Sequence, residues 1–238
     1  MNTTKEQSLL SPDKQAVQRG RITEKVLSFL LIETFTSTEV FQEYLEYSSR
    51  LGCHKSLRRL QKIGYITEYD LDTLAGRKIK LWGITSKGIY AVSDPEITTP
   101  KIKTFNTSKI SLLTLPHRLK SHKIAIQAIK NGYNLENGSI IFKSYGKIPD
   151  IILSNPRTNE FTSLEIELSV KTVSRYEKII KAYSKPLKYK VIKTVIWIVP
   201  DEKIKNRLKK IFNLFSSPSL ESHKVVTISE YHLPAVIP

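Results

Sequence analysis

The chain has 238 residues, 40% of them hydrophobic, which is enough for one large domain or two small ones with real cores. It carries 38 Lys and Arg against 22 Asp and Glu, a formal net charge of +16, so we expect a polyanionic partner. Nucleic acid is the first candidate and an anionic membrane surface the alternative. The sequence has no apolar run of bilayer-spanning length and no signal core, and its single cysteine excludes an internal disulfide and a cysteine-based zinc site. These features predict a cytoplasmic protein.

The positive charge is unevenly distributed along the chain. Residues 1–92 carry 14 basic and 10 acidic side chains, whereas residues 93–238 carry 24 and 12. The segment at the boundary is rich in Pro, Thr and Ser and has little periodicity, which is typical of a linker. We therefore expect four parts: a flexible N-terminus at 1–20, a first domain at 21–92, a linker at 93–110 and a second domain at 111–238.

The spacing of apolar residues predicts three helices in the first domain. They cover residues 21–34, residues 37–47 with Ser37 as N-cap, and residues 50–62. In the third helix we expect Leu51, Leu57 and Leu60 to pack inward, which leaves a basic outer face. Two strands follow, "GYITEYDL" and "RKIKLWGIT", joined by a turn at "DTLAGR", and "TSKGIYAV" closes the domain as a short capped helix or turn.

Three helices followed by a β-hairpin describe a winged helix-turn-helix, and "LQKIGYI…LWGITSKGIYAV" resembles the ending of many such domains. The third helix would enter the major groove of DNA while the hairpin contacts phosphate. The alternatives are a basic helix that is simply solvated, or a domain that binds protein through its acidic second helix. The candidate DNA-binding residues are Arg50, Lys55, Arg58, Arg59 and Lys62 on the helix and Arg77, Lys78 and Lys80 in the hairpin.

The second domain is predicted to contain a mixed sheet with helices on both faces. The predicted elements are a helix at 115–130, strands at 139–146, 147–155 and 161–170, a helix at 172–190 ended by Pro186, a strand at 194–200, a helix at 201–215 and a strand at 224–231. The three consecutive strands predict an antiparallel meander. The helix at 201–215 is amphipathic, and we expect its apolar face, with Leu208 and Phe212, to pack onto the sheet.

Two glutamates stand two residues apart in the predicted strand "SLEIELSVK". Because side chains alternate along a strand, Glu165 and Glu167 share a face, and the ordinary interpretation is an amphipathic strand with one wet face. However, "IPDIIL" lies just upstream, and a hairpin-like turn would bring Asp150 beside Glu165. Three carboxylates that converge within a cationic surface would raise each other's pKa unless a cation lies among them. Hard oxygen ligands suit Mg²⁺ or Mn²⁺, which beside a phosphate can activate water, as in a metal-dependent nuclease.

The sequence resembles a known nuclease motif at these positions. Pro149 and Asp150, followed after fourteen residues by "EIE", resemble the PD-(D/E)xK pattern, and the element order from residue 115 resembles that fold. The resemblance implies an α+β chain whose second domain is an α/β restriction-endonuclease-like domain with a mixed sheet. The lysine that the pattern has two residues after its glutamate is replaced by Glu167, and the nearest substitute is Lys171. The acid of the first helix is also missing, and His117, His122 or Gln127 are its candidate replacements.

A narrower resemblance covers nearly the whole chain. A winged helix, "LPHRL", "IPDIIL" and "LEIELSVKTVSRYEKIIKAY" together resemble the replication-relaxation family, which includes the MobC-type relaxases of mobilizable plasmids. The resemblance implies nicking of double-stranded DNA at a transfer origin at the start of conjugative mobilization, with an accessory mobilization protein and a coupling protein as partners and no membrane. The alternatives are a non-catalytic accessory or regulatory protein that binds DNA, and a transposase-type nuclease of the same fold.

The resemblance also implies a role for each candidate residue. Asp150 and Glu165 would bind the metal, and Glu167 would be a third ligand or a base. Lys171 would neutralise the phosphate or orient water. On the basic helix that follows, the candidate DNA contacts are Arg175 and Lys178, while its tyrosines are assigned to packing or phosphate contact.

Overall fold

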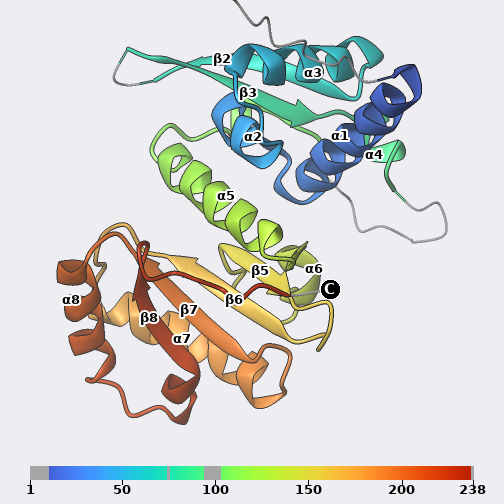
Figure 1. Ribbon diagram of the computed structural model, residues 1–238. Coiled ribbons are helices and arrows are strands. Elements are labelled where there is room, and N and C mark those ends of the chain that lie inside the picture. The colour runs from blue at the N-terminus through green and yellow to red at the C-terminus, as the bar shows by residue number, and fades with distance from the viewer. Residues whose placement is uncertain (1–10, 74–75, 94–102, 237–238) are drawn as a thin grey trace, which may run out of the picture. The chain divides into compact units, whose positions relative to one another are not determined.

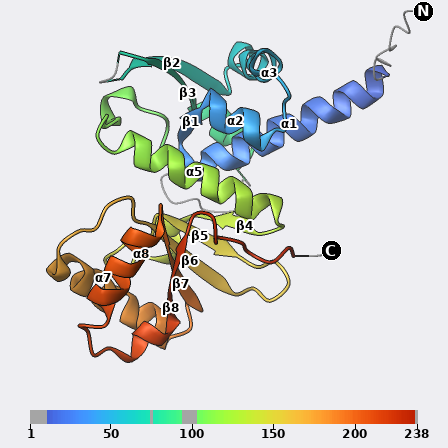
Figure 2. The same cartoon turned by 60° about the vertical axis from the view of Figure 1, so that its left-hand side comes forward.

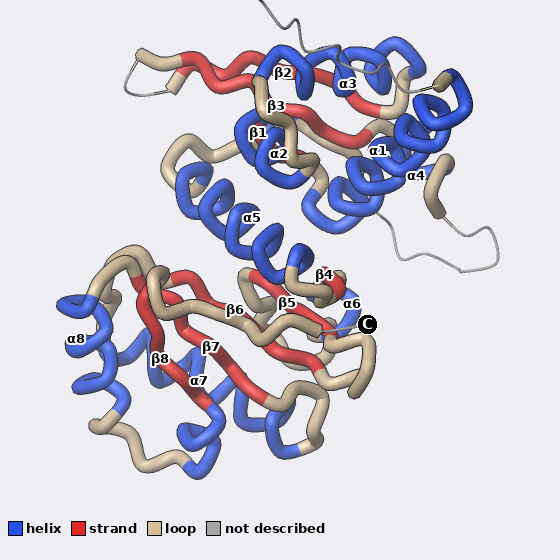
Figure 3. The backbone as a smooth tube through the Cα atoms, in the orientation of Figure 1, coloured by secondary structure: helices blue, strands red, loops and turns tan. Residues whose placement is uncertain are grey.

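The computed structural model describes residues 11–73, 76–93 and 103–236, and the chain folds as two compact units, Met1–Ile110 and Ser111–Pro238 (Figure 1). The protein is α+β, with a three-stranded antiparallel sheet in the first unit and a five-stranded mixed sheet in the second (Figure 3). Parts of the expected flexible N-terminus, hairpin turn and linker lie outside the described residues, namely 1–10, 74–75 and 94–102. Within the described part, no helix is long and apolar enough to cross a membrane.

The first unit contains the predicted helices and hairpin together with one strand that was not predicted. Its elements are α1 (Pro12–Glu33), β1 (Phe35–Ser37), α2 (Thr38–Tyr44), α3 (Arg50–Ile63), β2 (Ile66–Asp72), β3 (Lys78–Ile84), α4 (Ser86–Tyr90) and a 3-10 turn, η1 (Thr107–Lys109). Helix α1 starts with a proline, which suits the first helical position, so residues 12–20 are helical although we expected them in the flexible N-terminus. Strand β1 pairs antiparallel with β3, giving the order β1-β3-β2. It was missed because its three residues are too few for a periodic pattern.

Helix α3 shows how local sequence determines where a helix of this unit begins, where it ends and which face it buries. The Ser49 side chain caps its start by accepting a hydrogen bond from the Gly52 N–H, and Gly64 ends it in the left-handed conformation at φ 85°. The expectation that Leu51 packs inward is wrong, because Leu51 is 67% exposed. The buried face is Cys53, Leu57 and Leu60, spaced by four and three residues, and Leu51 lies off that face.

The end of the expected linker belongs to the first unit. The Phe105 N–H donates to the Ile84 carbonyl at 3.0 Å, and the Phe105 ring lies 5.3 Å from the Phe35 ring, centroid to centroid. Gly83 leaves the space that this ring occupies, because a Cβ there would lie 2.0 Å from Phe105 Cγ. Phe105 is therefore held against β3.

The second unit has the predicted order of elements with one substitution. Its elements are α5 (Leu115–Lys130), β4 (Asn134–Glu136), α6 (Gly138–Ile141), β5 (Ile151–Ser154), β6 (Phe161–Ile166), α7 (Val173–Lys188), β7 (Thr194–Val199), α8 (Glu202–Phe212), a 3-10 turn, η2 (Pro218–Ser222), and β8 (His223–Thr227). The sheet order is β4-β5-β6-β7-β8, antiparallel from β4 to β6 and parallel from β6 to β8.

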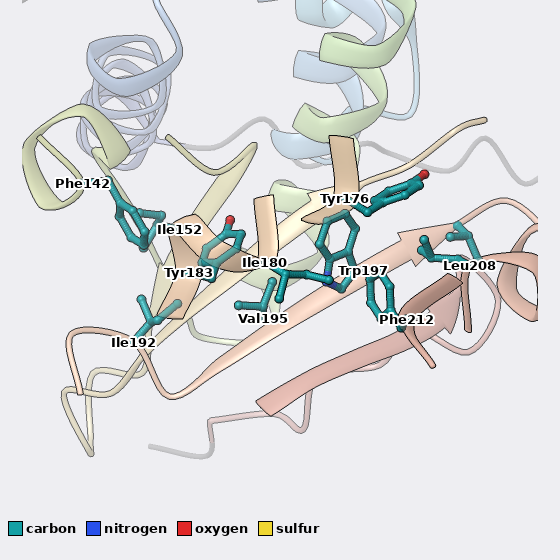
Figure 4. Packing of buried hydrophobic residues seen from close by; sticks show 11 residues of the cluster. Phe142, Ile152, Tyr176, Ile180, Tyr183, Ile192, Val195, Trp197, Leu208 and Phe212 are labelled. Atoms are coloured by element: carbon teal, nitrogen blue, oxygen red, sulfur yellow. The ribbon is translucent and has the colours of Figure 1, made fainter. Parts of the chain in front are cut away.

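Helices cover both faces of this sheet, as predicted (Figures 1 and 2). On one face, Ile124, Ala125 and Ala128 of α5 pack against Leu153, Leu164 and other apolar residues of the strands. On the other face, residues of α7 and α8 enclose Trp197 of β7 (Figure 4). The prediction for α8 is confirmed, since Leu208 and Phe212 are buried in this second cluster. Because the strands alternate, Glu165 faces the α7 side.

Two predicted details of this unit are wrong. The expected strand at 139–146 is the short helix α6 and the turns after it, because the Asn137 side chain accepts from the Ser139 N–H and starts a helical turn. The first strand of the meander is β4 instead. Pro186 does not end α7, which runs on to Lys188. The proline is buried and stands in the last turn, where it removes a hydrogen bond without stopping the helix.

Candidate active site

Strand pairing brings Asp150 to Glu165. In the β5–β6 ladder Ile151 is opposite Leu164, so the antiparallel register places Asp150, one residue before β5, opposite Glu165. Asp150 Oδ2 accepts a hydrogen bond from the Ile166 N–H at 2.8 Å. This bond fixes the Asp150 carboxylate at the end of the hairpin, beside the glutamate.

The Glu165 carboxylate is buried between the sheet and α7, with 6% of the residue exposed. The Tyr183 hydroxyl donates to Glu165 Oε1, and Lys147 Nζ lies 2.6 Å from the same oxygen. Burial is the main cause that raises the pKa of Glu165; Lys147 opposes the shift and the Asp150 charge adds to it, and the net pKa is about 7. Glu165 is therefore a carboxyl group that can gain or lose its proton near neutral pH.

Lys147 is a site residue that sequence analysis missed. It stands in the loop before β5 and its amine reaches the buried glutamate, although Lys147 lies eighteen residues away in sequence. The only sequence signal is its position three residues before Asp150 in "KIPD", and this position indicates a contact with Glu165 only when the strand register is known. Lys147 precedes Glu165 in the sequence, whereas Lys171 follows it.

Glu167 and Lys171 form a second pair just beyond β6. Glu167 is 7% exposed, and its N–H donates to the Ile198 carbonyl at 3.0 Å, which extends the pairing with β7 past the end of the strand. Lys171 Nζ lies 2.8 Å from Glu167 Oε1 and also donates to Ser169 Oγ at 2.9 Å. The Tyr176 hydroxyl accepts from the Lys171 N–H at 3.0 Å. Burial, reinforced by Glu167, raises the pKa of Tyr176, so this tyrosine is a neutral hydroxyl.

His117 of α5 is the residue that reaches the site from the first helix of the unit. Its Nε2 lies 2.7 Å from the Ile166 carbonyl oxygen and 3.5 Å from Asp150 Oδ2. A carbonyl can only accept, so Nε2 carries the proton and donates it there. Of the other two candidates, Gln127 donates to the Tyr231 carbonyl at 3.5 Å, and His122 is 1% exposed.

The donor chemistry of Asp150 and Glu165 fits a hard divalent ion. The partly exposed Asp150 carboxylate repels the buried Glu165 carboxylate and contributes to its raised pKa, and a cation between the two would remove that repulsion. Mg²⁺ is commonly held by one or two carboxylates together with substrate phosphate. No group of three or more His, Cys, Asp or Glu side chains is arranged as a metal site among the described residues. The role of Glu167 as a third ligand or base stays a prediction.

The expected DNA-binding cations of the first unit fall into two groups. Those exposed on the surface are Arg50, Lys55, Arg58 and Lys62 of α3 and Arg77 and Lys78 of the hairpin. Arg59 is turned back onto α1, where it donates to the Arg19 carbonyl at 3.2 Å. Lys80 is paired with Asp70 at 2.8 Å and with Glu68 at 3.4 Å, and Lys78 Nζ is 4.0 Å from Asp72. Arg59 and Lys80 are thus engaged within the protein.

Arg175 and Lys178 are exposed on α7 and lie close in sequence to the Glu167–Lys171 pair. They belong to the positive face of that helix, while Tyr176 and Tyr183 occupy its buried face (Figure 4). The two tyrosines therefore serve packing and hydrogen bonds to the glutamate pairs.

No protein-family model matches the sequence, and comparisons with curated proteins and with solved structures find no match.

Proposed function

We propose that this protein is a DNA-binding, metal-dependent endonuclease. Its narrower form, implied by the resemblance of the sequence, is a relaxase-like nickase that acts at a plasmid transfer origin to start conjugative mobilization. The observation that carries the proposal is the buried Glu165 carboxyl beside Asp150, with the Lys147 ammonium at 2.6 Å, in a chain of net charge +16. A buried carboxyl group whose pKa is raised by burial and by a neighbouring carboxylate is typical of catalytic sites.

Asp150 and Glu165 would hold Mg²⁺ or Mn²⁺, which when bound lowers the pKa of water and stabilises charge on phosphate oxygens. The lysine expected two residues after Glu165 is absent, and Lys147 supplies an ammonium to that carboxylate instead. Phosphodiester hydrolysis needs a base for the water and a cation for the developing charge. Glu167, once Lys171 turns from it to a substrate phosphate, can accept the proton, and Lys147 or Lys171 can neutralise the phosphate.

The first unit supports binding to duplex DNA. Helix α3 carries no acidic residue, and Arg50, Lys55, Arg58 and Lys62 are exposed on it, followed by the β2–β3 hairpin. A helix with such a face, followed by a hairpin, fits the winged helix-turn-helix manner of entering a major groove. A restriction-endonuclease-like second unit would then receive the DNA strand.

A second candidate is a non-catalytic DNA-binding accessory or regulatory protein. It is favoured by one observation: both glutamates already have a lysine partner, Lys147 for Glu165 and Lys171 for Glu167. Such pairs can serve as internal ion pairs of a scaffold that has no reaction to catalyse. A transposase-type nuclease would share the site and differ in the sequence that it cleaves.

The test is nicking of a supercoiled plasmid that carries the DNA flanking the protein's own coding sequence, with Mg²⁺, Mn²⁺ or EDTA. We expect open circles only with metal. Asp150→Asn should reduce the rate by roughly 100-fold or more, because it removes a charged ligand. Asp201→Asn is the matched control, since Asp201 caps α8 through Ile204 and asparagine caps equally well. Duplex binding without nicking under any metal would replace the proposal by the second candidate.

A further inference from the structure

A cleft of about 830 Å³ lies between the start of α7 and one side of α8. The residues that line it include four cations, Lys171, Arg175, Arg207 and Lys210, and no acidic residue. It is separate from the buried Glu165 carboxylate and is connected to the candidate active site through Lys171, whose ammonium contacts Glu167 at 2.8 Å.

The positive charge of the cleft is largely uncompensated. Lys171 pairs with Glu167, whereas Arg175, Arg207 and Lys210 are exposed, and none of the ion pairs found within the described residues includes them. Gathering like charges around one concave surface costs free energy, and a bound anion would offset that cost. In addition, the Thr172 side chain makes no capping bond at the start of α7, so N–H groups of its first turn add to the positive field.

The cleft is also apolar between its cations. Val173, Ile211 and Leu214 line it, and Val173 and Leu214 are 43% and 68% exposed. A phosphate alone makes no favourable contact with such an apolar surface, whereas a nucleotide has both a charged phosphate and a flat apolar base. In a duplex the bases are stacked inside the helix, so only an unpaired strand can offer both. A lipid headgroup supplies the phosphate but no flat base to lie against Val173 and Leu214.

We propose that this cleft binds an unpaired nucleic-acid strand, with phosphates on Arg175, Arg207 and Lys210 and a base against Val173 and Leu214. The inference rests on the proposed function, since the cleft then holds the strand that leads to or from the carboxylate site. Lys171 would link the two, because it lines the cleft and contacts Glu167.

The experiment measures binding of a fluorescein-labelled twelve-nucleotide oligothymidylate to the full-length protein in EDTA, over a range of NaCl concentrations. The cleft variant is Arg207→Gln with Lys210→Gln. The matched control is Lys209→Gln with Lys224→Gln, two exposed lysines of the same unit that do not line the cleft. Both pairs remove two charges. At 50 mM salt we expect roughly tenfold weaker binding for the cleft variant and a salt slope smaller by about 1.4, with a minor change in the control.

Equal losses in the two variants would overturn the proposal, because they would show diffuse electrostatic attraction. The proposal is equally wrong if the cleft variant binds the oligonucleotide normally but loses binding to phosphatidylserine vesicles, which would assign the cleft to a membrane surface. EDTA keeps the outcome independent of cleavage. If the wild type never nicks DNA but the cleft variant binds the oligonucleotide more weakly than the control variant, the nuclease proposal is wrong and the cleft proposal stands. If the wild type nicks DNA but the two variants bind alike, the cleft proposal is wrong and the nuclease proposal stands.

Discussion

At the scale of single residues, the most unusual feature is a carboxyl group held in the core by one tyrosine and one lysine. Glu165 is 6% exposed and its environment favours the protonated form, because burial outweighs the attraction of Lys147. A buried ionised carboxylate costs stability unless its partners compensate fully. The protein therefore tolerates a destabilising group at the position where the proposed function needs one.

This cost predicts a pH-dependent effect of Glu165→Gln. The pKa of Glu165 rises from its ordinary 4.5 to about 7 on folding, so the folded state binds more protons between these values and wild-type stability falls as pH rises through them. Glutamine resembles the protonated acid and avoids that loss. The variant should match the wild type near pH 4.5 and exceed it by up to about 3 kcal/mol at pH 8.

Urea unfolding at several pH values measures this difference. Glu160→Gln is the control, because Glu160 is exposed and Lys193 lowers its pKa, so that removing its charge should give no gain as pH rises. A constant difference between Glu165→Gln and the wild type across this pH range would contradict the buried-carboxyl explanation.

At the scale of elements, the contact between Gly83 and Phe105 joins β3 to the segment that follows residue 102. Phe105 fills the space above Gly83, and its N–H is bonded to the Ile84 carbonyl. Gly83→Ala should therefore displace the ring and cost about as much as Phe105→Ala, roughly 1–3 kcal/mol for a partly buried aromatic side chain.

A double-mutant cycle tests this contact. In the Phe105→Gly background both the ring and the Phe105 Cβ, which would lie 2.3 Å from the new Cβ, are gone. Gly83→Ala should then cost little, and the coupling energy should approach the cost of removing the Phe105 side chain. Gly20→Ala on α1 is the control, since no atom lies within 4 Å of the new Cβ and helix propensity favours alanine. Additive effects at Gly83 and Phe105 would show that the two positions are independent.

The elements that the sequence predicts well are those with strong, local signals. Helix α5, the β2–β3 hairpin, strand β7 and amphipathic α8 all lie where the sequence predicts them. The prediction fails at 139–146, where the apolar run "IIF" resembles a strand but a local asparagine cap selects a helical turn. Lys147 could not be predicted as a partner of Glu165, because their contact depends on the strand register and on the path of the loop before β5.

At the scale of the whole molecule, the two units differ in net charge as well as in structure. Residues 1–110 carry 17 basic and 12 acidic side chains, and residues 111–238 carry 21 and 10. The second unit thus has the larger excess of positive charge, and it contains both the carboxylate site and the cationic cleft. Under the proposed function, affinity for nucleic acid should draw on both units.

The second unit should fold by itself. Both apolar clusters of its sheet are built only from residues after Ser111, and its length is typical of a domain. A fragment of residues 111–238 should unfold in one cooperative transition and give amide NMR peaks that overlay those of the full chain. A fragment that begins at residue 133 lacks α5, uncovers one face of the sheet and should aggregate or remain unfolded. A disordered 111–238 fragment would contradict the division.

The buried Cys53 gives the protein a practical property. It is the only cysteine in the sequence, it is fully buried, and burial raises the pKa of its thiol to about 11. At neutral pH only roughly one thiol in a thousand or fewer is the reactive thiolate. A cysteine introduced at Leu214, which is 68% exposed on the cleft, would therefore be the one group that a maleimide dye modifies. The natural chain therefore needs no cysteine removed before a dye is attached at position 214, where its fluorescence would report binding of the proposed unpaired strand.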